Sequence, residues 1–496
     1  MYKIRQIKYA LNSISIQVYK IENRKRVIIR HIGTAHTELE KVDLLVLAND
    51  FIEKISKQLN LFENNTSSNI LYVNQTTFLG SYYTFLHELL SKLIITIGFD
   101  KLKNNLLLDL VIMRMIEPAS KLRSIELLDE YFGIKHRRQS YYESAPLWLQ
   151  LKSKTEAITL DFAKRQYAFT FDLLFYDVTT LYFESFDEDE LRKNGFSKDN
   201  KSQQPQILVA LMVTKEGFPI AYEVFAGNTF EGHTIIPMVN SFIERNKIKD
   251  FTIVADAAMI STENVKVLKE NKVNYIVGAR MGNISNELIN KIDKRITRED
   301  AKSIRIKTDN GYLICSYSSL RYRKDKYEME KQIEKAKIII ENPAKNKKLK
   351  FTKSNGQKIE LNQRLIDKTK MLLGIKGYYT NLEENIVDSK TVIERYHELY
   401  KIEQAFRIAK SDLQTRPIFH FKEEPIKLHL LTCFMALVLS KHIELQTKTS
   451  IRKFIHECKK ITDARLFNNI TGKELRIRTQ INPITLEIIS KLHLLT

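Results

Sequence analysis

The spacing of hydrophobic positions changes along the chain and divides it into regions. In residues 1–34, apolar and polar residues alternate over short stretches, which is the spacing of β-strands. Beyond this β piece, Leu, Ile and Val recur at helical intervals in 35–60, 80–97, 101–117 and 119–132. Residues 1–165 are therefore predicted to hold a small β piece followed by a mainly helical domain.

A different order of elements begins near residue 167. Three strands are predicted in succession, followed by a helix, a strand, a second helix beginning at Ser261 and Thr262, and a final strand. The predicted strands are 173–184, 207–214, 220–227, 251–259 and 274–279. Short links between the first three favour antiparallel pairing, and the helical crossovers favour parallel neighbours. A mixed sheet in this order has the ribonuclease H-like topology, so we expect an α/β fold.

The net charge narrows the choice of partners. The chain has 79 Lys and Arg against 59 Asp and Glu, which gives a formal charge of +20 spread along its length. A positive field of this size attracts polyanions such as nucleic acid or an acidic membrane face. A basic surface with no polyanionic partner is the alternative.

The cysteines and the apolar runs indicate the cellular compartment of the protein. Cys315, Cys433 and Cys458 are far apart and lack the spacing of a disulfide framework or a zinc site. The N-terminal residues contain no apolar signal region, and the apolar run 428–440 is too short to span a bilayer. We therefore expect this run to be a core helix, the protein to be cytoplasmic, and no membrane to be a partner.

The predicted sheet brings two aspartates together, and they form a candidate site. Asp177 interrupts FYDVTTLYFES, a stretch otherwise rich in β-branched and aromatic residues, and Asp256 ends the predicted fourth strand in TIVADAAMIS. In the predicted topology the first and fourth strands are neighbours, so both carboxylates face the same corner of the sheet. Paired carboxylates suit Mg²⁺, which prefers hard oxygen ligands and keeps positions for water and a substrate phosphate.

A third carboxylate is expected on the helix-patterned segment 389–414. Tyr396, Leu399, Glu403 and Lys410 are separated by three, four and seven residues, which places them on one stripe of a continuous helix. Glu403 is expected to point at the metal ions, with Tyr396 and Lys410 along DNA on either side. A solvent-facing helix glutamate is the other interpretation of this segment.

These segments resemble the DDE transposases of bacterial insertion sequences. DVTTLYFE at 177–184 looks like the family's first-aspartate block, and VADAAMISTENV at 254–265 resembles its second. The family's glutamate helix carries Tyr-x2-Arg-x3-Glu-x6-Lys, which this chain matches except for Leu399 in the arginine position. The resemblance covers roughly 170–280 and 375–445.

The resemblance implies an activity and its residues. Asp177, Asp256 and Glu403 would be both the catalytic and the metal-binding residues, holding two Mg²⁺ ions for which Mn²⁺ can substitute. The reaction would be strand cleavage at the ends of a mobile element, followed by attack of the 3′-hydroxyl on target DNA. The expected DNA-binding residues are Tyr396, Lys410, Arg407 and Arg416. Arg395 and Arg407 flank the stripe and are candidates for the role of the missing arginine.

The segment between the second aspartate and the glutamate is expected to be an insertion, 281–373. Two Asn-Gly hairpin signals, in 304–318 and 350–362, surround a charged amphipathic helix, so we expect it to be β-rich. Some transposases of this kind hold a flipped base on an aromatic residue of such an insertion. Four tyrosines are candidates for that role here or for burial in the hairpins: Tyr312, Tyr317, Tyr322 and Tyr327.

The sequence thus predicts a multidomain DNA transposase, acting on terminal inverted repeats and target DNA as a homodimer and associated with the bacterial nucleoid. Two alternatives stay open: a catalytically inactive DNA-binding protein derived from a transposase, as a repressor or decayed copy, and a metal-dependent nuclease of the same fold. The expected segments are a DNA-binding or dimerisation region at 1–165, the core at 166–280 and 374–445, the insertion at 281–373, and a C-terminal region at 446–496.

Overall fold

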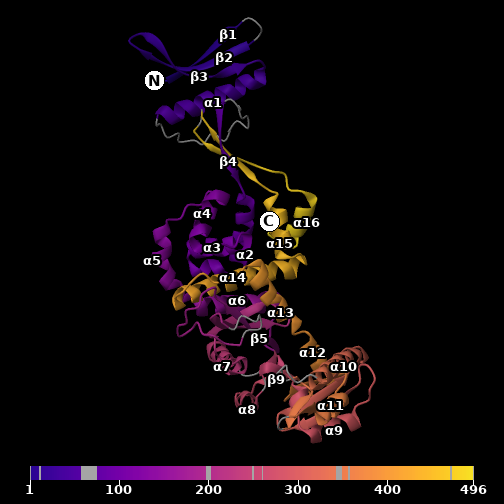
Figure 1. Ribbon diagram of the computed structural model, residues 1–496. Coiled ribbons are helices and arrows are strands. Elements are labelled where there is room, and N and C mark those ends of the chain that lie inside the picture. The colour runs from indigo at the N-terminus through magenta and orange to yellow at the C-terminus, as the bar shows by residue number, and fades with distance from the viewer. Residues whose placement is uncertain are drawn as a thin grey trace. The chain divides into compact units, whose positions relative to one another are not determined.

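The fold is taken from a computed structural model of the chain (Figure 1). It describes residues 2–9, 13–56, 75–196, 203–248, 251–259, 261–341, 349–355, 358–469 and 472–494. The end of the predicted helix 35–60, beyond residue 56, and Gly356 of the second Asn-Gly turn lie outside the described residues.

The chain forms two compact units, each assembled from segments distant in sequence. The first comprises Met1–Leu90, Glu126–Lys135 and Phe454–Ser490, and the second comprises Ser91–Ile125, His136–Lys453 and Lys491–Thr496. The expected boundaries after residues 165 and 445 do not coincide with this division, because β-pairing joins the C-terminal segment to residues near position 80.

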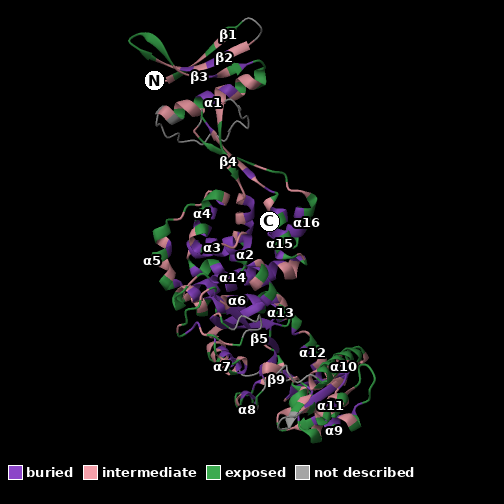
Figure 2. Ribbon diagram, viewed as in Figure 1, coloured by how far each residue is buried: buried purple, intermediate pink, exposed green. Residues whose placement is uncertain are grey.

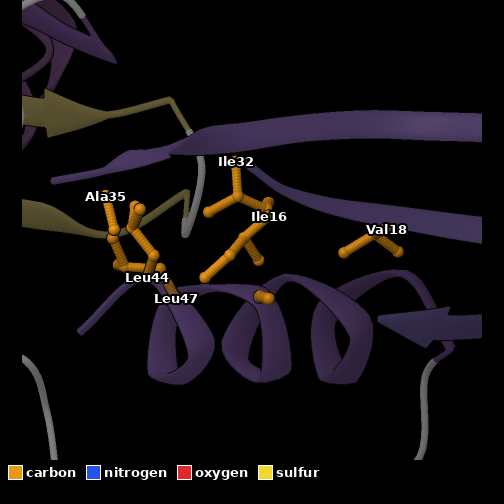
Figure 3. Packing of buried hydrophobic residues seen from close by; sticks show 7 residues of the cluster. Ile16, Val18, Ile32, Ala35, Leu44 and Leu47 are labelled. Carbon is orange, nitrogen blue, oxygen red and sulfur yellow. The ribbon is translucent and has the colours of Figure 1, made fainter. Parts of the chain in front are cut away.

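The first unit contains two three-stranded antiparallel sheets. One has the order β1-β2-β3, and α1 packs on it through Ile16, Val18, Ile32 and Leu44 (Figure 3). The other has the order β16-β15-β4. The bounds are β1 Tyr2–Tyr9, β2 Ser13–Glu22, β3 Lys25–Ala35, α1 Glu38–Ser56, β4 Thr76–Tyr82, α15 Ile451–Lys459, β15 Asp463–Asn468, β16 Glu474–Arg478 and α16 Pro483–Ser490. The β piece predicted for 1–34 is confirmed.

An eight-stranded mixed sheet is the centre of the second unit, in the order β10-β11-β14-β9-β8-β5-β6-β7. Within it, β5 to β7 pair antiparallel, whereas β8 runs parallel to both β5 and β9. The predicted order of strands is therefore confirmed, including the neighbouring first and fourth strands. The bounds are β5 Leu173–Tyr182, β6 Gln206–Thr214, β7 Pro219–Ala226, α7 Ile235–Asn246, β8 Thr252–Ala255, α8 Thr262–Glu270, β9 Asn274–Ala279 and β14 Ile375–Thr380.

The long core helix of the second unit packs against elements that precede it in the chain. Helix α14 packs against α3, α6 and β7, and Figure 2 shows it largely buried. It is long and apolar enough to cross a membrane, yet 94% of its apolar window is buried inside the protein, so the predicted core helix is confirmed. The remaining helices are α2 Thr84–Ile97, α3 Asn105–Ile116, α4 Lys121–Phe132, α5 Arg138–Trp148, α6 Leu151–Tyr167 and α14 Glu423–Thr447.

The segment 281–373 holds a hairpin at each of the two predicted positions, with the predicted charged helix between them. Its longest element is the 23-residue helix α10, and the hairpin β10-β11 extends the large sheet by pairing with β14. The other hairpin, β12-β13, has strands of only four residues. Short hairpins cannot bury an apolar face alone, so helices supply most of the local core. The bounds are α9 Asn286–Arg295, β10 Ser303–Thr308, β11 Gly311–Tyr317, α10 Ser319–Glu341, β12 Thr352–Asn355, β13 Lys358–Leu361 and α11 Gln363–Met371.

Candidate active site

Strand register places Asp177 beside Asp256. The parallel pairing of β5 with β8 reaches Tyr176 opposite Ala255, and each aspartate is the next residue along its chain. Neighbouring strands lie about 4.8 Å apart, and residues at equivalent positions of parallel strands point to the same face of a sheet. The two aspartates therefore occupy adjacent positions on internal strands, at the point where β8 ends, as the predicted topology required.

Each aspartate is oriented by the backbone that follows it. Val178 N donates to Asp177 Oδ1 at 2.8 Å, and Ala257 N donates to Asp256 Oδ1 at 2.7 Å. The Tyr396 hydroxyl donates to the same oxygen of Asp256 at 3.2 Å. Within the part of the chain that the structure describes, Asp256 Oδ2 accepts no hydrogen bond, so it is available as a ligand.

The helix predicted for 389–414 is divided into three. Helix α12 covers Ser389–His397, α13 covers Tyr400–Arg407, and a π-helical turn, η6, covers Ile408–Asp412. The prediction of one continuous stripe is therefore wrong. Apolar spacing did not reveal the break because Leu399, at the break, is a buried apolar residue that continues the helical spacing of Val392, Ile402 and Phe406. The two helices cover different strands, since α12 packs on β8, β9 and β14, and α13 packs on β5 and β6.

Tyr396 is largely buried and lies against Asp256. Only 7% of it is exposed, and its ring centroid lies 4.9 Å from that of Tyr378. Burial raises the pKa of Tyr396, and the nearby carboxylate of Asp256 raises it further, so the hydroxyl stays protonated and can donate. Gly278 on β9 makes room for this ring, because a Cβ there would lie 2.5 Å from the Tyr396 oxygen.

Glu403 projects from α13 near Asp256. Burial lowers the pKa of Lys376, and the charges of Asp256 and Glu403 each oppose that shift. Both carboxylates also act on Tyr396, whose pKa is raised mainly by burial, so they share one electrostatic neighbourhood. Glu403 is exposed and forms no hydrogen bond or ion pair with any described residue, which leaves its side chain able to rotate. Among the residues described, no group of three or more His, Cys, Asp or Glu side chains is arranged to hold a metal ion.

Lys376 is a residue of this site that the sequence did not single out. It is a half-buried lysine on β14, and its ammonium nitrogen lies 4.7 Å from the ring centroid of Tyr396 and 5.5 Å from that of Tyr378. The available signal was the same as for Asp177: a charged residue inside a strand otherwise rich in apolar and aromatic residues, IKGYYT.

The expected DNA-binding residues are spread along the second unit. Arg407 is exposed at the end of α13, and Lys410 lines a small apolar cavity with Thr179. The Arg416 guanidinium lies 5.3 Å from the centroid of the Tyr182 ring.

The tyrosines of the insertion occupy different environments. Tyr317 is buried and Tyr322 packs on the local core, whereas Tyr327 is 64% exposed. Tyr312 is half-buried beneath the Arg305 guanidinium, which lies 4.7 Å from its ring centroid. Burial in or beside the hairpins therefore describes three of the four.

The match to a known protein family covers the region that contains the candidate site. The family model described as "Transposase DDE domain" matches residues 169–439, which include all three carboxylates. No curated protein matches significantly. Among solved structures, the chain is similar to a cryo-EM structure of a piggyBac transposase synaptic complex with hairpin DNA, at 12% identity and a TM-score of 0.36, covering 83% of this chain and 75% of that one.

Proposed function

Because the chain belongs to the transposase DDE domain family and is therefore a DNA transposase, we propose that Asp177, Asp256 and Glu403 are its catalytic residues. The observation that carries the proposal is the register of β5 and β8, which puts both aspartates side by side at the carboxyl end of β8, inside the matched region. The order and directions of β5 to β9 support a ribonuclease H-like core. The signature on α12 and α13 supports the insertion-sequence group, with Leu399 in place of arginine.

The donor chemistry of these residues fits divalent metal ions, which the family generally uses. All three offer carboxylate oxygens, the ligands that Mg²⁺ and Mn²⁺ prefer. When bound, two such ions supply a polarised water or 3′-hydroxyl and a counter-charge for the leaving oxygen. The chain orients Asp256 through Tyr396, and rotation of the unpaired Glu403 side chain would complete the ligand set.

The reaction that this centre supports has two steps. Water attacks the phosphorus at an end of the element and the bond to the 3′ oxygen breaks, which leaves a 5′-phosphate and a 3′-hydroxyl. That hydroxyl then attacks a phosphorus of target DNA, and the target strand is released with its own 3′-hydroxyl. No covalent enzyme intermediate is needed, so the work of the side chains is positioning and charge.

We also propose which residues contact DNA and how the protein assembles on it. Lys410, Arg407 and Arg416 would hold phosphates beside the carboxylates, and the N-terminal region would bind the terminal inverted repeats. The net charge of +20 supports binding of a polyanion. A transposase must hold both ends of its element, so we propose a homodimer on DNA, located in the cytoplasm at the nucleoid.

Cleavage of labelled DNA tests this function. The substrate is a duplex carrying an element end, taken from the DNA that flanks the coding sequence, incubated with and without Mg²⁺ or Mn²⁺. We expect metal-dependent nicking by the wild type and none by Asp177→Ala, Asp256→Ala or Glu403→Ala, with end binding retained by all three. Binding without cleavage by the wild type would favour the inactive, transposase-derived protein. Nicking without any strand transfer would favour the nuclease.

A further inference from the structure

Lys376 combines three properties that a solvated surface lysine does not have. Its side chain is half-buried, its ammonium nitrogen lies over two tyrosine rings, and it is close enough to Asp256 and Glu403 for both to act on its charge. Even so, in the described residues it forms neither a hydrogen bond nor an ion pair. A cation therefore lies beside the candidate metal ligands without being bound to them.

The surroundings of Lys376 hold a second cation and open space. Lys376, Tyr378 and Arg321 line a groove of about 610 Å³, together with the carboxylates of Asp300 and Glu394. Asp256 and Glu403 do not line this groove. Lys376 connects it to Asp256 through the ring of Tyr396.

Arg321 already pairs with Asp325, at 3.3 Å between Nε and Oδ2, whereas the ammonium of Lys376 has no such partner among the residues that the structure describes. The tyrosine rings attract the cation by their negative faces and hold it in place, but they accept few hydrogen bonds from its N–H groups. The ammonium thus retains donors for an anion entering the groove.

We propose that Lys376 binds a non-bridging oxygen of the phosphate being cleaved, or of the phosphate beside it. This role rests on the proposed function. The substrate phosphodiester is the anion that must approach Asp256 and Glu403, and an ammonium is a strong hydrogen-bond donor to phosphate. As cleavage adds negative charge to the phosphoryl oxygens, this contact strengthens and stabilises the transition state. Lys376 would therefore be a catalytic residue that touches the reacting group.

A counter-ion role is the physical alternative. A lysine whose only effect is to offset the charge of Asp256 and Glu403 would weaken the attraction of these carboxylates for metal ions. Its removal would tighten metal binding and leave cleavage at saturating Mg²⁺ unchanged. A lysine bound to the phosphate gives the opposite result, since its loss lowers cleavage even when metal is saturating.

The test pairs a protein change with a substrate change. Wild type and Lys376→Met are compared on an end duplex with ordinary phosphates and on one with a neutral methylphosphonate at the position next to the cleaved bond. We expect Lys376→Met to lower cleavage of ordinary DNA at saturating Mg²⁺ by about 100-fold. The methylphosphonate should slow the wild type but have little further effect on the variant, since one interaction is lost in both cases.

Binding measurements separate this role from a structural one. Duplex affinity measured against salt concentration should show a slope reduced by about one phosphate contact in Lys376→Met, with an unchanged melting temperature. Lys370→Met is the matched control, because Lys370 is exposed on α11 and pairs with Asp367 at 3.8 Å.

Two results would overturn the inference while leaving the proposed function intact: equal cleavage by Lys376→Met and wild type, or a methylphosphonate effect that is the same in both proteins. Absence of cleavage by the wild type in both Mg²⁺ and Mn²⁺ would instead reject the proposed function, and the inference with it.

Discussion

The aspartates and the glutamate of the candidate site are held by elements of different kinds. Asp177 and Asp256 lie on or next to neighbouring strands, where a backbone N–H also fixes one oxygen of each. Glu403 lies on an eight-residue helix, is exposed, and has no hydrogen bond or ion pair among the described residues. The sheet therefore organises two of the proposed ligands before any ion or DNA arrives, whereas the helix carries a third that can still adjust.

Because the aspartates are fixed and the glutamate is not, we expect their substitution to affect metal binding unequally. The aspartate variants should show the largest effects. Asp177→Asn and Asp256→Asn should abolish the rise in melting temperature that Mn²⁺ gives the wild type, and lower cleavage by about 10³-fold or more. Glu403→Gln should also lose cleavage, yet weaken Mn²⁺ binding only about tenfold, as measured by calorimetry.

The control for this series is Asp172→Asn, because Asp172 is exposed before β5 and its carboxylate accepts a hydrogen bond from the Thr170 hydroxyl, at 3.1 Å. Equal loss of Mn²⁺ binding in all three site variants would show that the glutamate is as organised as the aspartates.

Gly278→Ala disturbs the contact between β9 and the Tyr396 ring of α12. The new Cβ would lie 2.5 Å from the Tyr396 oxygen and 3.2 Å from the Cβ of Ala257, so the ring must move away from Asp256. We expect cleavage to fall by about 10- to 100-fold and the free energy of unfolding to fall by about 1–3 kcal/mol.

Denaturant titration and a cleavage assay would measure the two effects of Gly278→Ala. Gly282→Ala is the matched control, since a Cβ at that position meets nothing within 4 Å. An unchanged cleavage rate in Gly278→Ala would mean that the position of the Tyr396 ring does not matter.

Tyr396→Phe makes the smallest change, because it removes only the hydroxyl that donates to Asp256. Loss of one hydrogen bond to a charged group costs about 1.5–3 kcal/mol. Because Ala257 N still donates to the same oxygen, we expect the lower end of this range, roughly a tenfold decrease in cleavage measured in single-turnover kinetics. Tyr400→Phe, at an exposed tyrosine of α13, should behave like the wild type. If Tyr396→Phe impaired DNA binding instead of cleavage, the residue would be a DNA contact, as the sequence alone suggested.

The core fold and the aspartate pair were predictable because they follow from local pattern and topology. Strand alternation, helix caps and the odd position of Asp177 inside an apolar strand are all visible in the sequence, and the element order fixes the neighbours of β5. Ser261 illustrates the local part, since its hydroxyl caps α8 by accepting from Asn264 N at 3.0 Å, as its position predicted.

Tertiary packing decided the rest. The division of the glutamate segment at Leu399, the burial of Tyr396 on Asp256 and the placement of Lys376 beside the carboxylates all depend on which strands the helices cover. The pairing of β15 with β4 likewise joins residues almost 400 positions apart. Hydrophobic spacing shows which face of an element is buried, but it does not show which distant element buries it, because that choice minimises the free energy of the whole chain.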